Sequence, residues 1–370
     1  MEFDFSSEQK LLKEQARRYL AEKASMKSVR AVLNGPQSFD RELWSGLVDM
    51  GFTGISIPEA LGGSGLGYLE LCVVAEEVGR VLAPVPFSSS IYLAAEFLMM
   101  AGNEEQKHRL LPEIVSGRGI GCLALTEGIG GASVDARVEG GRLSGTKIAV
   151  PDGDVATFAV VAARSVGAGN ALSLFLVDLG AEGIERVAVD AIDPTRSHAQ
   201  IAFDRAPAEP LGQPGDGRRL LDAVFDRAAV LLAFEQLGGA DRALEMARDY
   251  AQERMAFGRP IGSFQAVKHM LADMYVSATL ARSNCYFGAW ALSTAAAELP
   301  EAAATARLSA THAFQHCARN NIQVHGGIGF TWEADCHLFY RRSNLLALTL
   351  GSRPVWESRL VDQLCLRNAA

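Results

Sequence analysis

Paired cysteines are missing from this sequence. Its six cysteines are scattered along 370 residues, and no two of them form a C-x-x-C pair. They are Cys72, Cys122, Cys285, Cys317, Cys336 and Cys365. Disulfide frameworks and zinc sites both need cysteines at short, repeated spacings. The scatter therefore argues against both and favours buried free thiols in a reducing compartment.

Long apolar runs and basic runs are also missing. No apolar stretch approaches the ~20 residues that a membrane-spanning helix needs. The missing apolar run disfavours membrane insertion, and a net charge of -8 with no long basic segment disfavours nucleic-acid binding and electrostatic attachment to a membrane. The chain opens with the acidic stretch Met1-Glu2-Phe3-Asp4, whereas a secretory signal opens with a basic region before an apolar core. We therefore expect a cytoplasmic protein.

What the chain does contain is an ordinary globular balance, with 49% hydrophobic and 21% charged residues. Helical periodicity dominates the first part, and Ser6 followed by Gln9 predicts a capping box at its start. Further helices are expected over residues 40–50, 68–82, 91–101 and 103–117. The five glycines between Phe52 and Gly67 indicate a structured loop. These features predict an N-terminal α-helical domain at residues 1–118.

The period changes near Gly119. Short segments rich in Val, Leu and Phe predict strands over residues 121–125, 156–163, 171–177 and 198–203, and a hairpin over 139–147. They indicate a middle β domain at 119–213, either a barrel or a sandwich. Helical periodicity then returns over residues 220–254, 264–292, 301–323, 333–350 and 355–366, which predicts a C-terminal helical bundle at 214–370. The fold class expected is α+β.

One inter-helix segment carries an unusual set of side chains. The stretch Arg254–Pro260 reads R-M-A-F-G-R-P and connects two long helical patterns. It places the cations Arg254 and Arg259 beside the aromatic rings of Phe257 and Phe264. Cations and aromatic faces held on a turn suit a ligand that carries phosphate and a ring. The alternative is an ordinary helical hairpin with solvated charges.

Four motifs in order resemble the acyl-CoA dehydrogenase family of flavoproteins. They are P-E-A-L-G-G-S-G-L-G at 58–67, L-T-E at 125–127, R-M-A-F-G-R-P-I-G-S-F-Q at 254–265 and Q-V-H-G-G-I-G-F at 323–330. Each string alone is weak, but four in order within an α–β–α pattern are specific. The resemblance implies an N-terminal helical domain, a middle β domain and a C-terminal four-helix bundle. It also implies α,β-dehydrogenation of an acyl-CoA thioester, in which a glutamate takes the α-proton and FAD takes the β-hydride.

The resemblance assigns cofactor contacts to the C-terminal half of the chain. Arg254 resembles the arginine that reaches the FAD pyrophosphate of a neighbouring subunit, and Phe257 and Gln265 resemble adenosine-side contacts. Gln323, Gly326 and Gly327 resemble the loop that closes over the same half of the cofactor. A guanidinium can pair with two phosphate oxygens, and glycines let backbone N–H groups come close.

The middle domain departs from the family pattern. The family flavin loop usually reads L-T-E-P-x-A-G-S-D, whereas this chain has Ala132 where a phosphate-binding serine would stand, unless a one-residue shift places Ser133 there. The family strand that follows usually ends W-I-T-N. Here it reads A-V-P-D at 149–152, so the tryptophan and threonine that pack on the isoalloxazine are missing, and Pro151 lacks a backbone donor.

The usual catalytic glutamate is missing too. Leu350 and Ala228 stand at the two positions where family members place it, and neither can accept a proton. Glu235 is the candidate for a displaced base, because it lies seven residues beyond Ala228 and about 10 Å along the same helix face. Asp226 points off that face, and Glu357 resembles a solvated helix charge. We therefore assign no catalytic residue.

Histidines do not supply another chemistry. His312 and His316 lie four apart on a predicted helix, but no third ligand is evident, so no metal site is assigned. His325 beside Gly326 is interpreted as a loop anchor.

The losses affect groups for the chain's own flavin ring and substrate, whereas groups that reach a neighbour's FAD are kept. This asymmetry favours a non-catalytic-type subunit of a heteromeric α2β2 acyl-CoA dehydrogenase, of the kind that acts on bulky steroid side-chain CoA thioesters. The partners expected are an acyl-CoA, a homologous subunit and an electron-transfer flavoprotein. Two alternatives stay open: a self-sufficient homotetramer with a displaced base, and a flavin-free scaffold.

Overall fold

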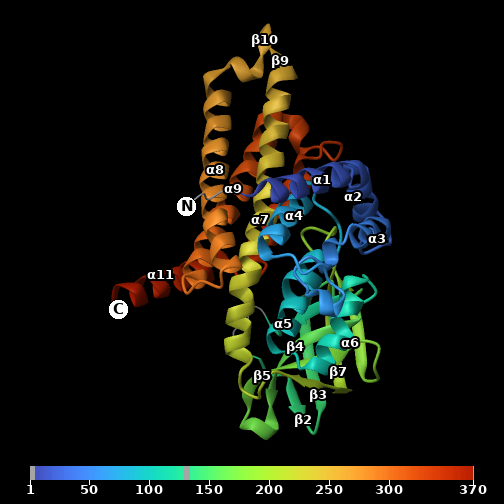
Figure 1. Cartoon of the computed structure of the whole chain (residues 1–370). Helices are drawn as coiled ribbons and strands as arrows, with labels where there is room; N and C mark the ends of the chain where they lie inside the picture. Colours follow the sequence, from blue (N-terminus) through green and yellow to red (C-terminus); the bar gives the residue numbers. More distant parts are fainter. Residues whose placement is uncertain (1–4, 129–133, 370) are drawn as a thin grey trace. The chain divides into compact units, whose positions relative to one another are not determined.

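A computed structural model describes residues 5–128 and 134–369 of the chain (Figure 1). Its contacts divide the chain into two compact units. The first comprises Met1–Val29, Gly67–Ala83 and Ala229–Ala370, and the second comprises Arg30–Leu66 and Pro84–Ala228. Each unit therefore combines segments that are distant in sequence. The division into 1–118, 119–213 and 214–370 follows the chain rather than these contacts and stays a proposal.

The first unit is helical. It contains α1 (Ser7–Lys23), α4 (Tyr68–Arg80), α8 (Gln265–Ser293), α9 (Leu299–His325), α10 (Cys336–Leu348) and α11 (Arg353–Ala369). Two helices, α2 (Met26–Asn34) and α7 (Gly217–Glu253), cross the boundary between the units. A small hairpin of β9 (Met255–Ala256) and β10 (Arg259–Pro260) joins the end of α7 to the start of α8 (Figure 1). The expected C-terminal bundle of long helices is confirmed.

Local sequence signals explain where these helices begin and how closely they pack. Ser6 accepts the backbone N–H of Gln9 while the Gln9 side chain accepts that of Ser6, so the capping box of α1 is confirmed. Helices α4 and α7 approach each other at two glycines. A Cβ atom on Gly79 would lie 1.8 Å from the carbonyl oxygen of Glu235, and one on Gly238 would lie 1.8 Å from that of Glu76. Only glycine permits this backbone contact.

A buried ionic network joins the helices of the first unit. The Glu76 carboxylate on α4 is 1% exposed and receives the Lys13 ammonium at 2.5 Å and the Arg282 guanidinium at 2.9 Å. Arg282 also pairs with Asp241 on α7. Burial alone would raise the pKa of Glu76, but the two cations outweigh it and hold that pKa below its usual value.

The second unit packs helices against a sheet. Its helices are α3 (Arg41–Asp49), α5 (Ala95–Ala101), α6 (Glu104–Val115) and a π-helical turn, η3 (Ser88–Ala94). Its strands are β1 (Gly121–Ala124), β2 (Arg137–Glu139), β3 (Arg142–Pro151), β4 (Phe158–Ser165), β5 (Ala171–Asp178), β6 (Ile184–Val189), β7 (His198–Pro207) and β8 (Glu209–Leu211). The strand order is β6-β7-β3-β2-β4-β5-β8, with β1 parallel to β4. The sheet is sandwich-like and does not close into a barrel.

Several short elements were not expected from the sequence, among them strand β6 and helix α2. Strand β6 is exposed along almost its whole length, so it lacks the alternation of buried and exposed residues by which a strand is recognised. Helix α2 is only nine residues long, and although the Ser25 hydroxyl accepts the backbone N–H of Ser28 at 3.4 Å at its start, no Glu or Gln three residues later completes a capping box.

None of the helices in the part of the chain that the structure describes is long and apolar enough to cross a membrane.

Candidate functional site

The hairpin between α7 and α8 presents a bulky aromatic side chain to solvent. Phe257 and Gly258 form its two-residue turn, and both have positive φ, 52° and 76°. Two-residue hairpin turns commonly require this conformation, which is easy for glycine and costly for phenylalanine. The Phe257 side chain is 95% exposed. A strained backbone therefore holds an apolar ring away from its own chain.

The hairpin also carries a cation stacked on a neighbouring ring. The Arg259 guanidinium lies 4.2 Å from the centre of the Phe264 ring, and Phe264 meets Phe257 edge-on at 6.2 Å. Arg254, at the end of α7, is exposed. Within residues 5–128 and 134–369, no carboxylate lies within ion-pair distance of Arg254 or Arg259. Gln265 is exposed and is the first residue of α8, and no side chain caps the start of this helix. Positive charge and uncapped backbone donors at this end suit an anion.

The second predicted segment lies at the same end of the helical unit. Helix α9 ends at His325, whose ring stacks on Tyr250 of α7 at 4.1 Å, one turn before Arg254. Gly326 follows with φ of 61°, and Gln323, Gly326 and Gly327 are all exposed. His325 also contacts the carbonyl of Asn321 at 2.8 Å, which agrees with its interpretation as a loop anchor.

These six residues fit one half of a dinucleotide. All six are exposed: Arg254 and Phe257 lie in the segment between α7 and α8, Gly326 and Gly327 follow α9, and Gln265 and Gln323 lie on the adjoining ends of α8 and α9. A guanidinium, an aromatic ring, two amides and two glycines supply what pyrophosphate and adenosine require. Because none of these side chains is buried in its own chain, the set is available to a ligand or to a second subunit.

The base of the predicted flavin loop is firmly held. The Glu127 carboxylate accepts the backbone N–H groups of Asp135 and Ala136 and pairs with the Lys147 ammonium at 2.5 Å. Lys147 has no exposed side-chain area, and burial lowers its pKa despite the pairing with Glu127. The two positions at which the phosphate-binding serine was sought, Ala132 and Ser133, lie outside the described residues. The roles proposed for them stay untested.

The turn that follows strand β3 is held by polar contacts from its own unit. Asp152 is 3% exposed and has φ of 55°. It accepts the Ser89 hydroxyl, and its backbone N–H donates to the Ser197 carbonyl at 2.8 Å. The absence of the family's ring-packing residues from this turn is visible in the sequence, whereas its serine partners come from distant segments and have no local signal.

The positions expected for a catalytic base are apolar, as the sequence requires. Ala228 is 1% exposed on α7, and Leu350 sits in the turn before α11 with φ of 63°. The displaced candidate, Glu235, has no exposed area and lies 3.8 Å from the guanidinium of Arg342, which is also buried. Asp226 is 6% exposed, and Glu357 pairs on the surface with Arg353 at 2.6 Å. The burial of Glu235 favours a structural role.

A buried arginine that the sequence analysis missed supports the Leu350 turn. Arg307 on α9 is 1% exposed and donates to the carbonyl oxygens of Leu346 and Thr349, the latter at 2.7 Å. The Trp356 indole N–H holds the carbonyl of Leu350 from the other side at 3.2 Å. Burial lowers the pKa of Arg307 to about 9. The turn that carries the base in the family is thus firmly built here, but it presents an apolar side chain.

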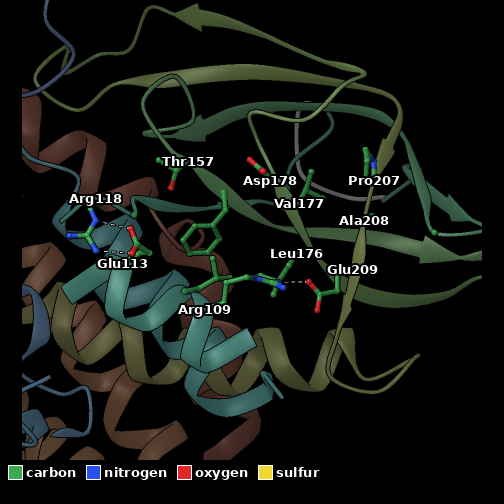
Figure 2. Close-up of a pocket in the computed structure, with 14 residues that line it drawn as sticks. Arg109, Glu113, Arg118, Thr157, Leu176, Val177, Asp178, Pro207, Ala208 and Glu209 are labelled. Carbon is green, nitrogen blue, oxygen red and sulfur yellow. Dashed lines mark hydrogen bonds and ion pairs between the residues drawn. The ribbon is translucent and has the colours of Figure 1, made fainter. Parts of the chain in front are cut away.

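A separate cavity of about 860 Å³ lies between α6 and the sheet of the second unit (Figure 2). Figure 2 shows its two ion pairs, Arg118–Glu113 at 2.8 Å and Arg109–Glu209 at 2.5 Å. Its apolar wall includes Phe158. None of the residues predicted for the site lines it, and its arginines are already paired, so we do not place the site there.

Metal chemistry has no support in the described part of the chain. His312 and His316 stack at 5.8 Å on α9, and burial lowers the pKa of His316. Within residues 5–128 and 134–369, no group of three or more His, Cys, Asp or Glu residues could hold a metal ion.

Comparisons with known proteins identify two domains. The N-terminal domain model of acyl-CoA dehydrogenases matches residues 6–118, and the C-terminal domain model matches residues 215–364. The acyl-CoA dehydrogenase IpdE2 of Mycobacterium tuberculosis is 33% identical over 362 residues, which cover 95% of this chain and 98% of that protein.

Two similar solved structures each bear the names of two chains. A chain of the ChsE4–ChsE5 complex of Mycobacterium tuberculosis superposes with a TM-score of 0.89 at 29% identity, covering 99% of both chains. A chain from a variant of the Tcur3481–Tcur3483 steroid ACAD superposes with a TM-score of 0.88 at 33% identity, covering 98% of this chain and 99% of that one.

Proposed function

This chain belongs to the acyl-CoA dehydrogenase family, and on that premise we propose that it is a subunit that completes the FAD site of a partner chain. The family is FAD-dependent, and the bound flavin would supply the hydride acceptor. In this proposal Arg254 binds the pyrophosphate of the partner's FAD, and Phe257 and Gln265 contact its adenosine side. The loop of Gln323, Gly326 and Gly327 closes over that half of the cofactor. The catalytic base comes from the partner.

The observation that carries the proposal is the state of Phe257. Its side chain is 95% exposed on a backbone with φ of 52°. Exposure of an apolar ring to water is unfavourable. A left-handed φ costs a further amount of about 1–2 kcal/mol for a non-glycine residue. A neighbouring subunit's ligand that covers the ring would offset both costs.

The names of a similar protein support the proposal that this chain pairs with a different subunit of the same family. The Tcur3481–Tcur3483 protein is a steroid ACAD. We therefore propose that this chain pairs with a homologous subunit that has an intact flavin loop and glutamate, and that the substrate is a bulky steroid-type acyl-CoA thioester. The electron acceptor we propose is an electron-transfer flavoprotein.

The self-sufficient alternative requires Glu235 to act as base. Its side chain is fully buried, and its carboxylate lies 3.8 Å from the buried Arg342. A general base must come within hydrogen-bond reach of the proton that it removes. The arrangement of this carboxylate therefore supports the partner model over the alternative.

The deciding experiment varies Arg254 in the assembled complex. We expect Arg254→Gln to weaken FAD retention by the complex of this chain with its partner by about 10–100-fold, because a charge-assisted contact to phosphate is worth about 1.5–3 kcal/mol. FAD affinity would be measured by flavin fluorescence during reconstitution. Arg219→Gln, an exposed arginine of the second unit paired only with Asp216, is the matched control and should leave affinity unchanged.

Two outcomes would contradict the proposal. One is unchanged FAD affinity in the Arg254→Gln complex. The other is an isolated homo-oligomer that binds one FAD per chain and oxidises an acyl-CoA. Loss of that turnover in Glu235→Gln would then establish the displaced-base alternative. A chain that binds no FAD with any homologous partner would establish the scaffold alternative.

A further inference from the structure

We infer that the first unit contains an anion-binding pocket that takes a small phosphomonoester, separate from the β9–β10 hairpin. A pocket of about 420 Å³ lies among α1, α2, α4, α7 and α10, and all its lining residues belong to the first unit. None of the six residues proposed to contact FAD lines it. The inference therefore goes beyond the proposed function and needs no partner chain.

Three guanidinium groups line this pocket, each from a different helix. Arg17 comes from α1, Arg80 from the end of α4 and Arg242 from α7. Among the described residues, Asp335 is the only acidic side chain in the lining, and it forms no ion pair with any of the three arginines. Cations gathered in one place repel one another unless an anion lies between them.

The two carboxylates that pair with these arginines do not serve them evenly. Glu77 is 1% exposed and accepts two hydrogen bonds from Arg17, at 2.9 and 2.8 Å. Glu245 serves both Arg80 and Arg242, which donate to the same oxygen, the second at 3.4 Å. One carboxylate thus faces two cations, and one positive charge is left over at the pocket. In the 860 Å³ cavity of the second unit, by contrast, each arginine has its own carboxylate.

Two of the guanidinium groups keep N–H donors for a ligand. A guanidinium carries five such donors. In the described part of the chain, Arg80 donates only through Nη2 and Arg242 only through Nη1. Arg80 is 15% exposed, so its unused donors are held in a sheltered place, where a hydrogen bond to phosphate is stronger than at the open surface. The planar arginine fork matches the spacing of phosphate oxygens.

The start of α2 adds positive potential at the same pocket. Ser25 and Met26, where this helix begins, both belong to the lining. The first turn of α2 contains no acidic residue. Backbone N–H groups at a helix start attract anions. The helix start and the arginines therefore favour an anion in one place.

The remaining lining is largely apolar and points to a ligand with a small ring or aliphatic body. It includes Met26, Val81, Met246 and Phe339. Methionine side chains adapt to irregular ligand shapes. The volume of about 420 Å³ lies within the range of ordinary small-ligand sites, about 300–1,000 Å³. A phosphomonoester carries about −1.5 to −2 charges at pH 7, which suits the cations, and its organic part suits the apolar wall.

Calorimetric titration of the full chain with phenyl phosphate tests the pocket, because this probe joins a phosphate to a small ring. At constant ionic strength we expect one probe to bind per chain, and inorganic phosphate, which lacks the ring, to bind more weakly. In Arg80→Gln/Arg242→Gln the affinity for phenyl phosphate should fall at least about tenfold, because charge-assisted donors are lost. Arg248→Gln/Arg353→Gln removes the same charge from exposed arginines of the same unit outside the pocket and should leave the affinity unchanged.

A second pocket variant leaves every ion pair in place. Ala21 lines the pocket and is exposed on α1, so Ala21→Glu adds a carboxylate there without removing a partner of Glu77 or Glu245. Repulsion of the phosphate should again lower the affinity at least about tenfold. The inference is overturned if the wild-type chain shows no saturable binding, if either folded pocket variant binds as tightly as the wild type, or if the control double variant loses as much affinity. Equal affinity for inorganic phosphate would overturn the assignment of a phosphomonoester.

Discussion

Single residues with strained backbones mark the positions that distinguish this chain. Among the residues that the structure describes, eight non-glycine residues have positive φ, and four of them are Ala149, Asp152, Phe257 and Leu350. Ala149 and Asp152 lie at the end of β3 and in the turn that follows it, Phe257 lies in the turn of the β9–β10 hairpin, and Leu350 lies in the turn before α11. Left-handed φ is retained only where surrounding structure imposes it. The sequence departs from the family pattern at Ala149, Asp152 and Leu350, whereas Phe257 resembles that pattern.

The buried Arg307 guanidinium is expected to contribute to stability through its hydrogen bonds to three acceptors. Replacing it with methionine should lower the free energy of unfolding of the helical unit by about 3–5 kcal/mol, because the carbonyls of Leu346 and Thr349 and the Gln236 side chain would lose their buried donor. Arg307→Lys should lower the free energy of unfolding by less, because the ammonium keeps the charge. Some loss should remain, because an ammonium cannot reach all the acceptors of the guanidinium. Urea unfolding followed by circular dichroism would measure both. A methionine variant as stable as the wild type would show that the network contributes nothing.

Among the elements, the crossing of α4 and α7 depends on glycine. The two helices touch through their backbones at Gly79 and Gly238, so side chains cannot act as spacers. Glycine inside a helix costs about 1 kcal/mol relative to alanine when nothing else is at stake. Its presence at both contacts indicates that close approach outweighs helix propensity.

Replacing a helical glycine with alanine usually raises stability, but at this crossing it should lower it. Gly238→Ala should destabilise the helical unit by more than about 2 kcal/mol, because the added methyl group would overlap the carbonyl of Glu76 and force the helices apart. Gly167→Ala, where no atom lies within 4 Å of the added carbon, is the control and should change stability little. Thermal unfolding would separate them. A higher melting temperature for Gly238→Ala would contradict the backbone contact.

At the scale of the whole molecule, stability should depend on acid through the network around Glu76. This carboxylate is held ionised by Lys13 and Arg282, so its folded-state pKa lies below the unfolded value of about 4.3. The unfolded chain therefore binds more protons as the pH falls. The stabilisation by Glu76 is complete above the unfolded pKa and is lost as the pH falls through the lower folded pKa.

This dependence can be measured by melting temperature between about pH 6 and pH 3. The wild-type chain should lose stability on acidification, and Glu76→Gln should be less stable near neutrality and respond less to acid. Glu113→Gln is a suitable control, because Glu113 pairs with Arg118 on the surface, where ion pairs contribute little. Parallel acid profiles for the wild type and Glu76→Gln would refute the role of the network.

The sequence by itself determined the order of helical and β segments, the family and the absence of a glutamate at both usual positions. These depend on periodicity and on residue identity, which are local properties. It predicted α7 through α11 well because long apolar repeats mark them, and it missed β6 because that strand buries almost nothing. The six proposed cofactor contacts followed from short motifs whose residues lie close together along the chain.

Only the tertiary structure decided what surrounds those positions. Ser38, Ser89 and Ser197 carry no local signal, yet they meet at Asp152 and Asp154 because the fold brings three distant segments to one turn. The same holds for Arg307, which lies about 40 positions before the turn that it supports. The sequence offers Glu235 as a candidate base. In the fold its side chain is fully buried beside Arg342. Burial and long-range pairing depend on three-dimensional neighbours, which no single stretch of sequence contains.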